Sequence, residues 1–138
     1  MKDSINVNWL GNLTFEAKVD GHSFIIDANE AVGGKDKGPS PKPLMMVSLA
    51  GCTGMDVASL LKKMRVDFES FNVKVEGELT EEHPKHFVAM HTVYEFKGKD
   101  LPLDKLKKAI ELSQDRYCGV SAVYRKTMKI SYEIKITE

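Results

Sequence analysis

Cysteine and net charge are both scarce in this sequence. Its 138 residues contain two cysteines, Cys52 and Cys118, and 20 basic side chains balance 20 acidic ones. Two cysteines are too few for a disulfide-stapled scaffold. A chain without a basic or acidic block lacks the charge pattern that binds nucleic acid or a membrane surface. We therefore expect neither of these partners.

An export signal is also lacking. The opening stretch MKDSINVNWLGNL has no apolar core and no small-residue cleavage site, so we expect a cytoplasmic protein. In that reducing compartment cysteines are free thiols, redox-active thiols or ligands rather than permanent disulfides. The remaining composition, 42% hydrophobic and 29% charged, is that of a globular protein, and the length suits a single domain over residues 1–138.

Alternation of apolar and polar residues predicts strands in both halves of the chain. Strands are expected at residues 4–10, 13–19, 22–28, 71–79, 86–96 and 127–137. Asp20-Gly21 is a two-residue hairpin signal, because both central turn positions need positive φ. The glycine- and proline-rich stretch from Glu30 to Pro43 predicts a loop.

Two longer segments and one short segment predict helices. Leu44–Arg65 is apolar nearly all the way round and about 33 Å long as a helix, which indicates a central, buried position. Its polar centre and two glycines argue against a membrane span. An amphipathic helix is expected from Leu103 to Ser113, and a short helical piece after Cys118. The order β-β-β-α-β-β-α-β predicts an α+β fold.

The apolar helix also predicts an oligomer. One small sheet and one amphipathic helix cannot cover it on every side, so a second subunit would have to supply the rest. A symmetric homodimer is the commonest arrangement of this kind.

The two cysteines lie in different local settings. Cys52 is in mid-helix, where burial raises a thiol pKa, and a carboxylate one turn later, Asp56, would raise it further. Cys118 precedes a short helix and has Arg116 and Arg125 nearby in sequence, which would favour its thiolate. If the two met in space they would form a dithiol. The alternative is a pair of buried cysteines that act as small hydrophobic side chains.

Other motifs point to no cofactor. The lysines of the 30–43 loop do not have the spacing of a phosphate-binding loop. His83 and His86 have no further ligand at a suitable spacing, so a zinc site there is not expected. We expect neither a nucleotide nor a metal.

Two stretches together resemble the OsmC/Ohr family of osmotically inducible and organic hydroperoxide resistance proteins. GPSPKPLMMVSLAGCTGMDVASLLKK resembles the first cysteine motif of that family, and AIELSQDRYCGVSAVYRKTMKISYEI resembles the second. The resemblance covers nearly the whole chain in length and element order. It implies an OsmC-like fold and an intertwined homodimer, with the thiol pair at the subunit interface.

The resemblance also implies an activity. Carried over by position, Cys52 would attack an organic hydroperoxide and Cys118 would resolve the resulting sulfenic acid as a disulfide. A lipoyl group or a small thiol would then reduce the disulfide, so no bound cofactor is required. This chemistry is a stress response to peroxides.

The chain departs from the family pattern at two activating positions. Peroxidases of the family have a glutamate nine or ten residues before the first cysteine, where this chain has Pro43 and Lys42, and an arginine near the first hairpin, which GNLTFEA lacks. Lys42, Arg116, Arg125 and Glu30 are the candidate substitutes for supporting a thiolate. In this respect the chain resembles the broad OsmC-like branch. The alternative function is a non-catalytic OsmC-like dimer that binds a hydrophobic small molecule or senses redox state.

Overall fold

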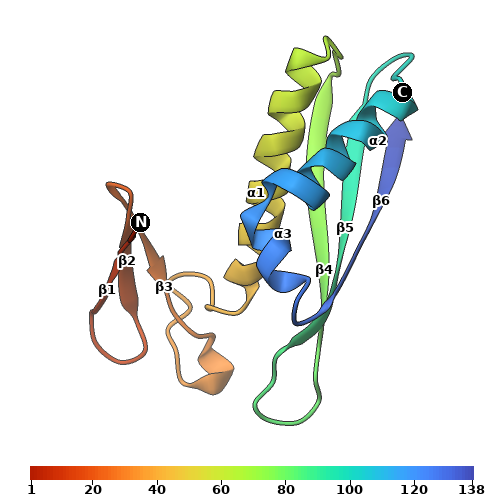
Figure 1. Cartoon of the computed structure of the whole chain (residues 1–138). Helices are drawn as coiled ribbons and strands as arrows, with labels where there is room; N and C mark the ends of the chain where they lie inside the picture. The colour runs from red at the N-terminus through yellow and green to blue at the C-terminus, as the bar shows by residue number, and fades with distance from the viewer. The chain divides into compact units, whose positions relative to one another are not determined.

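The computed structural model describes residues 1–138, which form two compact units, Met1–Met45 and Met46–Glu138. Figure 1 shows strands in the first unit and a mixture of helices and strands in the second. The predicted α+β class and element order are confirmed, including the short helix expected after Cys118. One domain over residues 1–138 stays a prediction.

The first unit is a three-stranded antiparallel sheet with an ordered loop. Its strands are β1 (Asn6–Trp9), β2 (Phe15–Val19) and β3 (His22–Ile26), in the order β1-β2-β3. The β2–β3 turn has positive φ at both central residues, 51° at Asp20 and 76° at Gly21. The Asp-Gly hairpin is therefore confirmed, for the conformational reason that predicted it.

The loop after β3 is organised around one buried carboxylate, that of Asp27. Thr14 Oγ1 donates to it at 2.9 Å, and the backbone N–H groups of Ala28, Lys35 and Lys37 donate at 2.7, 3.5 and 3.3 Å. Burial alone would raise the pKa of Asp27, but these hydrogen bonds together lower it. The Asp27 side chain thus connects Thr14, just before β2, to three backbone N–H groups of the loop. The loop also contains the short turn η1 (Glu30–Val32).

The second unit contains a three-stranded mixed sheet. Its strands β4 (Ser70–Leu79), β5 (Phe87–Lys97) and β6 (Lys129–Thr137) lie in the order β4-β5-β6. β4 and β5 form an antiparallel hairpin, whereas β6 runs parallel to β5. A parallel neighbour requires a crossover connection, which the helical segment between β5 and β6 provides.

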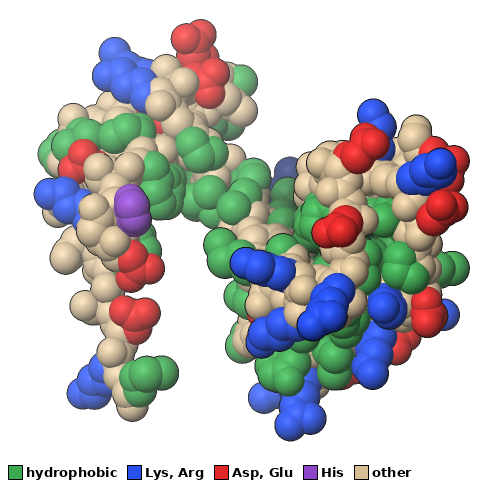
Figure 2. Space-filling view, turned by 90° about the horizontal axis from the view of Figure 1, so that it is seen from above, with side chains coloured by type: hydrophobic (Ala, Val, Ile, Leu, Met, Phe, Trp, Pro, Cys, Tyr) green, Lys and Arg blue, Asp and Glu red, His purple; other side chains and the backbone are tan.

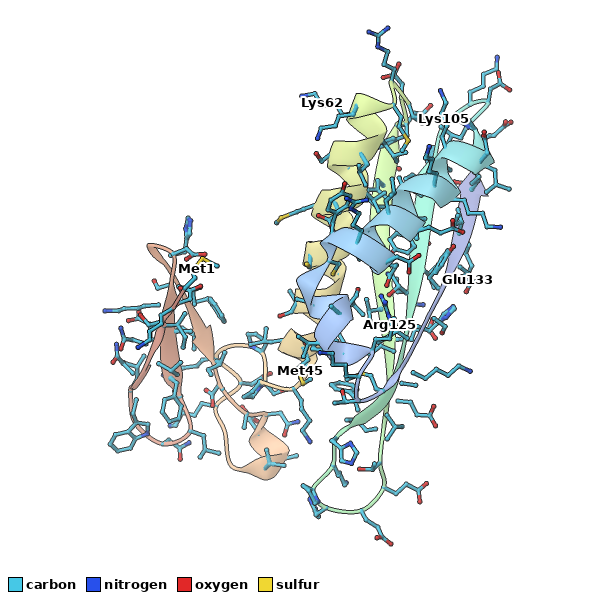
Figure 3. All side chains as sticks on the ribbon, viewed as in Figure 1. Met1, Met45, Lys62, Lys105, Arg125 and Glu133 are labelled. Carbon is cyan, nitrogen blue, oxygen red and sulfur yellow. The ribbon has the colours of Figure 1, made fainter.

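Three α-helices and one π-type turn accompany this sheet. α1 (Pro43–Lys63) precedes β4, while α2 (Leu103–Leu112), the π-type turn η2 (Ser113–Tyr117) and α3 (Gly119–Tyr124) lie between β5 and β6. The core joins α1, α2 and β5, and its fully buried members include Val57, Leu61, Leu106, Ile110, Tyr94 and Phe96. α2 begins at the end of the unit where α1 finishes, as the labels of Lys105 and Lys62 show (Figure 3). The two helices therefore pack on one face of the sheet.

α1 is buried on one side only. Its buried residues form one stripe at intervals of four, namely Leu49, Thr53, Val57 and Leu61. On other faces Val47 is 62% and Met55 77% exposed. A Cβ at Gly54 would lie 3.4 Å from Val73 of β4, whereas nothing lies within 4 Å of one at Gly51. The sheet thus reaches only one side of the helix, as expected for a single chain, and the second subunit that would cover the rest stays a prediction.

α1 is long and apolar enough to cross a membrane by length and composition, with a mean hydropathy of 1.6 over its best window, of which 22% is buried. A single helix of this kind is weak evidence for a span, since core helices of soluble proteins meet the same test. Here its buried stripe includes Thr53, whose hydroxyl is hydrogen-bonded to two other elements.

Apolar side chains also reach the surface of the first unit. β1 is exposed along its whole length, and Val7, Trp9 and Phe24 are among the exposed large hydrophobic residues. Hydrophobic atoms are visible on the surface of both units in Figure 2. Apolar faces of this kind are common at interfaces.

Asp27→Asn should destabilise the first unit at neutral pH, because an amide places N–H donors against the backbone donors of the loop. The lowered pKa of Asp27 means that its contribution is fully present above the usual carboxyl value of 3.8 and is lost as the pH falls below it. Thermal unfolding at neutral and acid pH measures both effects. The wild type should lose this stability on acidification, whereas the variant should lack it already at neutral pH.

Asp20→Asn is the matched control. Asp20 is exposed in the hairpin turn at φ 51°, a conformation that asparagine adopts equally well. An equal loss of stability in both variants would contradict the role given to the Asp27 hydrogen bonds.

Candidate functional site

The structure brings both cysteines and one carboxylate together within the second unit. The sulfurs of Cys52 and Cys118 and a carboxylate oxygen of Asp56 all lie within 4.8 Å of one another. Both thiols are free; Cys118 is 2% exposed and Cys52 is half-buried. The sequence left open whether the two thiols meet in space. The structure brings them close together within a single chain.

Helical spacing positions the α1 members of the site. Cys52 and Asp56 are four residues apart, so they lie on one face one turn from each other. Each directly precedes a buried residue of the α1 stripe, Thr53 and Val57 respectively. The two groups consequently flank the part of α1 that packs inside the unit.

Cys118 is positioned by the way α2 ends. Its backbone N–H donates to the carbonyl of Ser113 at 2.7 Å, the i to i−5 bond of a π-type turn. Cys118 then has extended backbone angles, φ −78° and ψ 102°, and is the N-cap of α3. The predicted position of this cysteine at a break before a short helix is confirmed.

Each sulfur accepts a hydrogen bond from the first turn of α3. Ser121 N–H donates to Cys118 Sγ at 3.3 Å. Val120 N–H is hydrogen-bonded to the Cys52 thiol. The short helix therefore holds both sulfurs through adjacent backbone groups.

A chain of buried hydrogen bonds ends on Asp56. Tyr94 OH lies 2.7 Å from Thr53 Oγ1, which lies 2.8 Å from Ser113 Oγ. Ser113 Oγ donates to Asp56 Oδ2 at 2.9 Å. At the other end, Gln114 Nε2 donates to Tyr94 OH at 2.7 Å.

The two ends fix the direction of this chain. A carboxylate only accepts and an amide nitrogen only donates, while each hydroxyl has one proton to give. Ser113 gives its proton to Asp56, so Thr53 donates to Ser113 and Tyr94 donates to Thr53. Burial raises the pKa of Tyr94, which keeps its hydroxyl protonated for this role. The network thus orients the Asp56 carboxylate.

The electrostatic setting of Cys52 disfavours its thiolate. Burial is the main cause that raises the Cys52 pKa, and the neighbouring Cys118 and the negative charge of Asp56 raise it further. The Val120 hydrogen bond acts in the opposite direction. Asp56 forms no ion pair, so no cation cancels its charge directly. The sequence expectation for both Cys52 and Asp56 agrees with this arrangement.

The candidate thiolate-supporting residues lie in several places. The Arg125 guanidinium donates to the Gln114 carbonyl, and Arg125 directly follows α3 (Figure 3). Arg116 lies 5.9 Å from the ring centre of Tyr117. Glu30 and Lys42 belong to the first unit. The proposed support of the thiols by any of these four residues stays a prediction.

Sequence reasoning did not identify the four members of the hydrogen-bond network, which are Thr53, Tyr94, Ser113 and Gln114. A signal existed for Thr53, since a polar residue one position after Cys52 interrupts an otherwise apolar stripe. Ser113 was placed on the amphipathic stripe of α2, but its partners are 57 and 60 residues away in sequence. Such distant pairings are not visible in local patterns.

A pocket of about 350 Å³ borders the site. It is lined by Asp56, Ser59, Leu60, Lys63 and Tyr117, all from the second unit. Asp56 belongs to both the pocket and the three-atom cluster, so the pocket meets the cluster at this residue, and neither cysteine lines it.

The fold and the site together define a class of protein. It is an α+β protein in which a cysteine on a helix lies next to a second cysteine that precedes the last strand. A family model described as OsmC-like protein matches residues 34–133. The chain belongs to the OsmC-like family.

Individual relatives agree with this assignment. Protein YhfA of Escherichia coli K12 is 31% identical over 131 residues, which cover 94% of this chain and 95% of that protein. A hypothetical protein from Aquifex aeolicus VF5 has a crystal structure that superposes with a TM-score of 0.83 at 28% identity, over 100% of this chain and 99% of that one. The organic hydroperoxide resistance protein OhrB of Bacillus subtilis shares the fold, with a TM-score of 0.65 at 17% identity and 98% coverage of both chains.

Thr53→Val should lower the free energy of unfolding by about 2 kcal/mol, because it leaves the buried hydroxyls of Tyr94 and Ser113 without their partner. Thr92 of β5 is the matched control: it is also fully buried, but its hydroxyl has no hydrogen-bond partner. Thr92→Val should leave stability unchanged or raise it by up to about 1 kcal/mol. Denaturant unfolding at one fixed protein concentration compares them, and equal effects would contradict the network.

Asp56→Asn should make Cys52 more reactive near neutral pH. Removing the negative charge lowers the Cys52 pKa, so a larger fraction of the thiol is ionised and alkylation by iodoacetamide becomes faster. Mass spectrometry of the alkylated peptide gives the rate at each pH. A rate that stays the same or falls would show that Asp56 does not control this thiol.

Proposed function

We propose that this protein reduces organic hydroperoxides with the Cys52–Cys118 pair. The observation that carries the proposal is the convergence of the two sulfurs, from α1 and from the turn before α3, within 4.8 Å. Family membership supports it, since structural neighbours include proteins named for organic hydroperoxide resistance. The resemblance of both cysteine motifs gives the same roles to the two thiols.

The chemistry proceeds in two steps on the protein. The Cys52 thiolate attacks the distal peroxide oxygen, the O–O bond breaks, and the alkoxide takes a proton and leaves as the alcohol. Cys52 is then a sulfenic acid, which Cys118 attacks to form the disulfide and release water. An external dithiol such as a lipoyl group, or two small thiols, returns both cysteines to the reduced state. Hydroperoxide and two thiols thus become alcohol, water and one disulfide.

Exposure supports the order of attack. Cys52 is half-buried and Cys118 almost fully buried, so a peroxide in the chain as described has easier access to Cys52. The adjoining pocket offers space for the organic group beside Asp56. Burial and the Asp56 charge hold the Cys52 pKa high, so the first step should accelerate as the pH rises.

The working form is proposed to be a cytoplasmic homodimer. Exposed apolar residues on α1 and on the first unit, such as Val47, Met55 and Trp9, are consistent with an interface between copies of the chain. The resemblance implies that a second subunit lies against the thiol pair, where it would add to the walls of the site.

One observation favours a second candidate function. No lysine or arginine forms an ion pair with Asp56. Burial raises the pKa of Cys52, and the neighbouring Cys118 and Asp56 raise it further. A non-catalytic OsmC-like dimer that binds a hydrophobic small molecule, or senses redox state, does not need an activated thiolate.

The test is oxidation of the reduced protein by cumene hydroperoxide, followed by mass spectrometry without reductant. The wild type should lose two hydrogen atoms, and Cys52→Ser and Cys118→Ser should each prevent that loss. Cys118→Ser should instead form a sulfenic acid at Cys52 that dimedone traps, because its resolving thiol is gone. Dihydrolipoyl compounds should restore the oxidised wild type.

Cys52→Ser is the matched comparison for the order of attack. Dimedone labelling of Cys118 in that variant would reverse the two roles. If both thiols of the wild type stay reduced under excess peroxide, the binding function replaces the enzymatic one.

A further inference from the structure

The site contains a donor set that peroxide reduction does not require. Two thiols and one carboxylate oxygen converge within 4.8 Å, with two donors from one turn of α1 and the third from the turn before α3. A disulfide needs only the two sulfurs. The carboxylate takes no part in that bond, so its place beside the two sulfurs calls for a different explanation.

All three donor groups are held by further hydrogen bonds. Ser113 Oγ donates to Asp56 at 2.9 Å, Ser121 N–H donates to Cys118 at 3.3 Å, and the Val120 N–H is bonded to Cys52. Ordered outer contacts of this kind orient metal ligands and adjust their affinity. No lysine or arginine forms an ion pair with Asp56, so its charge is available to a cation.

We propose that Cys52, Cys118 and Asp56 form a binding site for a thiophilic divalent cation of the Zn²⁺ type. In a tetrahedral site with Zn–S bonds of about 2.3 Å, the ligand atoms lie about 3.8 Å apart. No separation among the three donors exceeds that spacing by more than about 1 Å, a difference that small side-chain rotations remove. Three protein ligands leave the fourth position for water.

Metal binding and disulfide formation exclude each other at this site. Binding converts both thiols to thiolates and releases their two protons to solvent, while no electron is transferred. Both sulfurs are then bound to the cation, and neither can attack a peroxide or the other sulfur. Bound metal therefore keeps the dithiol reduced, and oxidation to the disulfide expels the metal.

The experiment titrates the reduced full-length protein with Zn²⁺ alone, under anaerobic conditions, against a chromophoric chelator. We expect one Zn²⁺ per chain, and Co²⁺ in its place should give a sulfur-to-cobalt charge-transfer band. Cys52→Ser and Cys118→Ser should each weaken affinity by roughly a hundredfold or more, and Asp56→Asn by roughly tenfold or more. Asparagine is nearly isosteric with aspartate, so a loss of affinity in Asp56→Asn reports the missing carboxylate ligand.

A double variant, His83→Ala with His86→Ala, is the matched control. Both histidines are exposed in the loop between β4 and β5, and their removal should leave affinity unchanged. The wild-type chain oxidised to its disulfide should bind no Zn²⁺, a readout that does not depend on how any variant folds. The measurement uses no peroxide, so it stands apart from the outcome of the peroxidase test.

Several results would each overturn the proposal. They are the absence of Zn²⁺ binding by the reduced wild type, equal binding by the disulfide form, and loss of binding in the histidine variant. Unchanged affinity in Asp56→Asn would remove the carboxylate from the site and also contradict the proposal as stated.

Discussion

The arrangement of the site depends on one residue, Ser113. Its hydroxyl accepts from Thr53 and donates to Asp56, both on α1, while its carbonyl accepts the backbone N–H of Cys118. One buried serine thus joins the helix that carries Cys52 to the turn that carries Cys118. The π-type turn is what allows this, because it places the Ser113 carbonyl and the Cys118 amide at bonding distance after α2 has ended. Cys52 and Cys118 are far apart in the sequence, so no local structure would bring their sulfurs together without these hydrogen bonds.

The same network gives the site its electrostatic character. A chain of three hydroxyl groups ends on the Asp56 carboxylate, and each donor polarises the next. This stabilises a negative charge close to two thiols, which is the reverse of the usual way to activate a cysteine. A neighbouring cation is what lowers the pKa of a reactive thiol, whereas the charged group beside these two thiols is an anion. Because the charge beside the thiols is negative and not positive, two functions and a metal site are considered for the same pair of sulfurs.

Sequence patterns predicted the elements and the two thiols, but not the contacts that define the site. Alternation placed the six strands to within a few residues, and the break before Cys118 was visible from the residues alone. The parallel pairing of β6 with β5 was not predicted, because register between distant strands depends on tertiary packing. Thr53 and Tyr94 were missed for the same reason: their hydroxyls lie 41 residues apart in sequence. The apolar composition of α1 indicated that one chain could not cover it on every side, and in the single chain only one stripe of the helix is buried.

Asp56 links the two chemistries proposed for the site. For a peroxidase its carboxylate is a cost, since it reduces the fraction of Cys52 that is thiolate at neutral pH. For a divalent cation the same carboxylate is a ligand. Two thiolates and one carboxylate carry three negative charges, which more than balance the two positive charges of the cation. The two demands are compatible if the dithiol is held inactive while metal is bound and becomes available when the metal leaves. Which chemistry prevails at a given moment then depends on the relative concentrations of metal and peroxide, and not on a change in the fold.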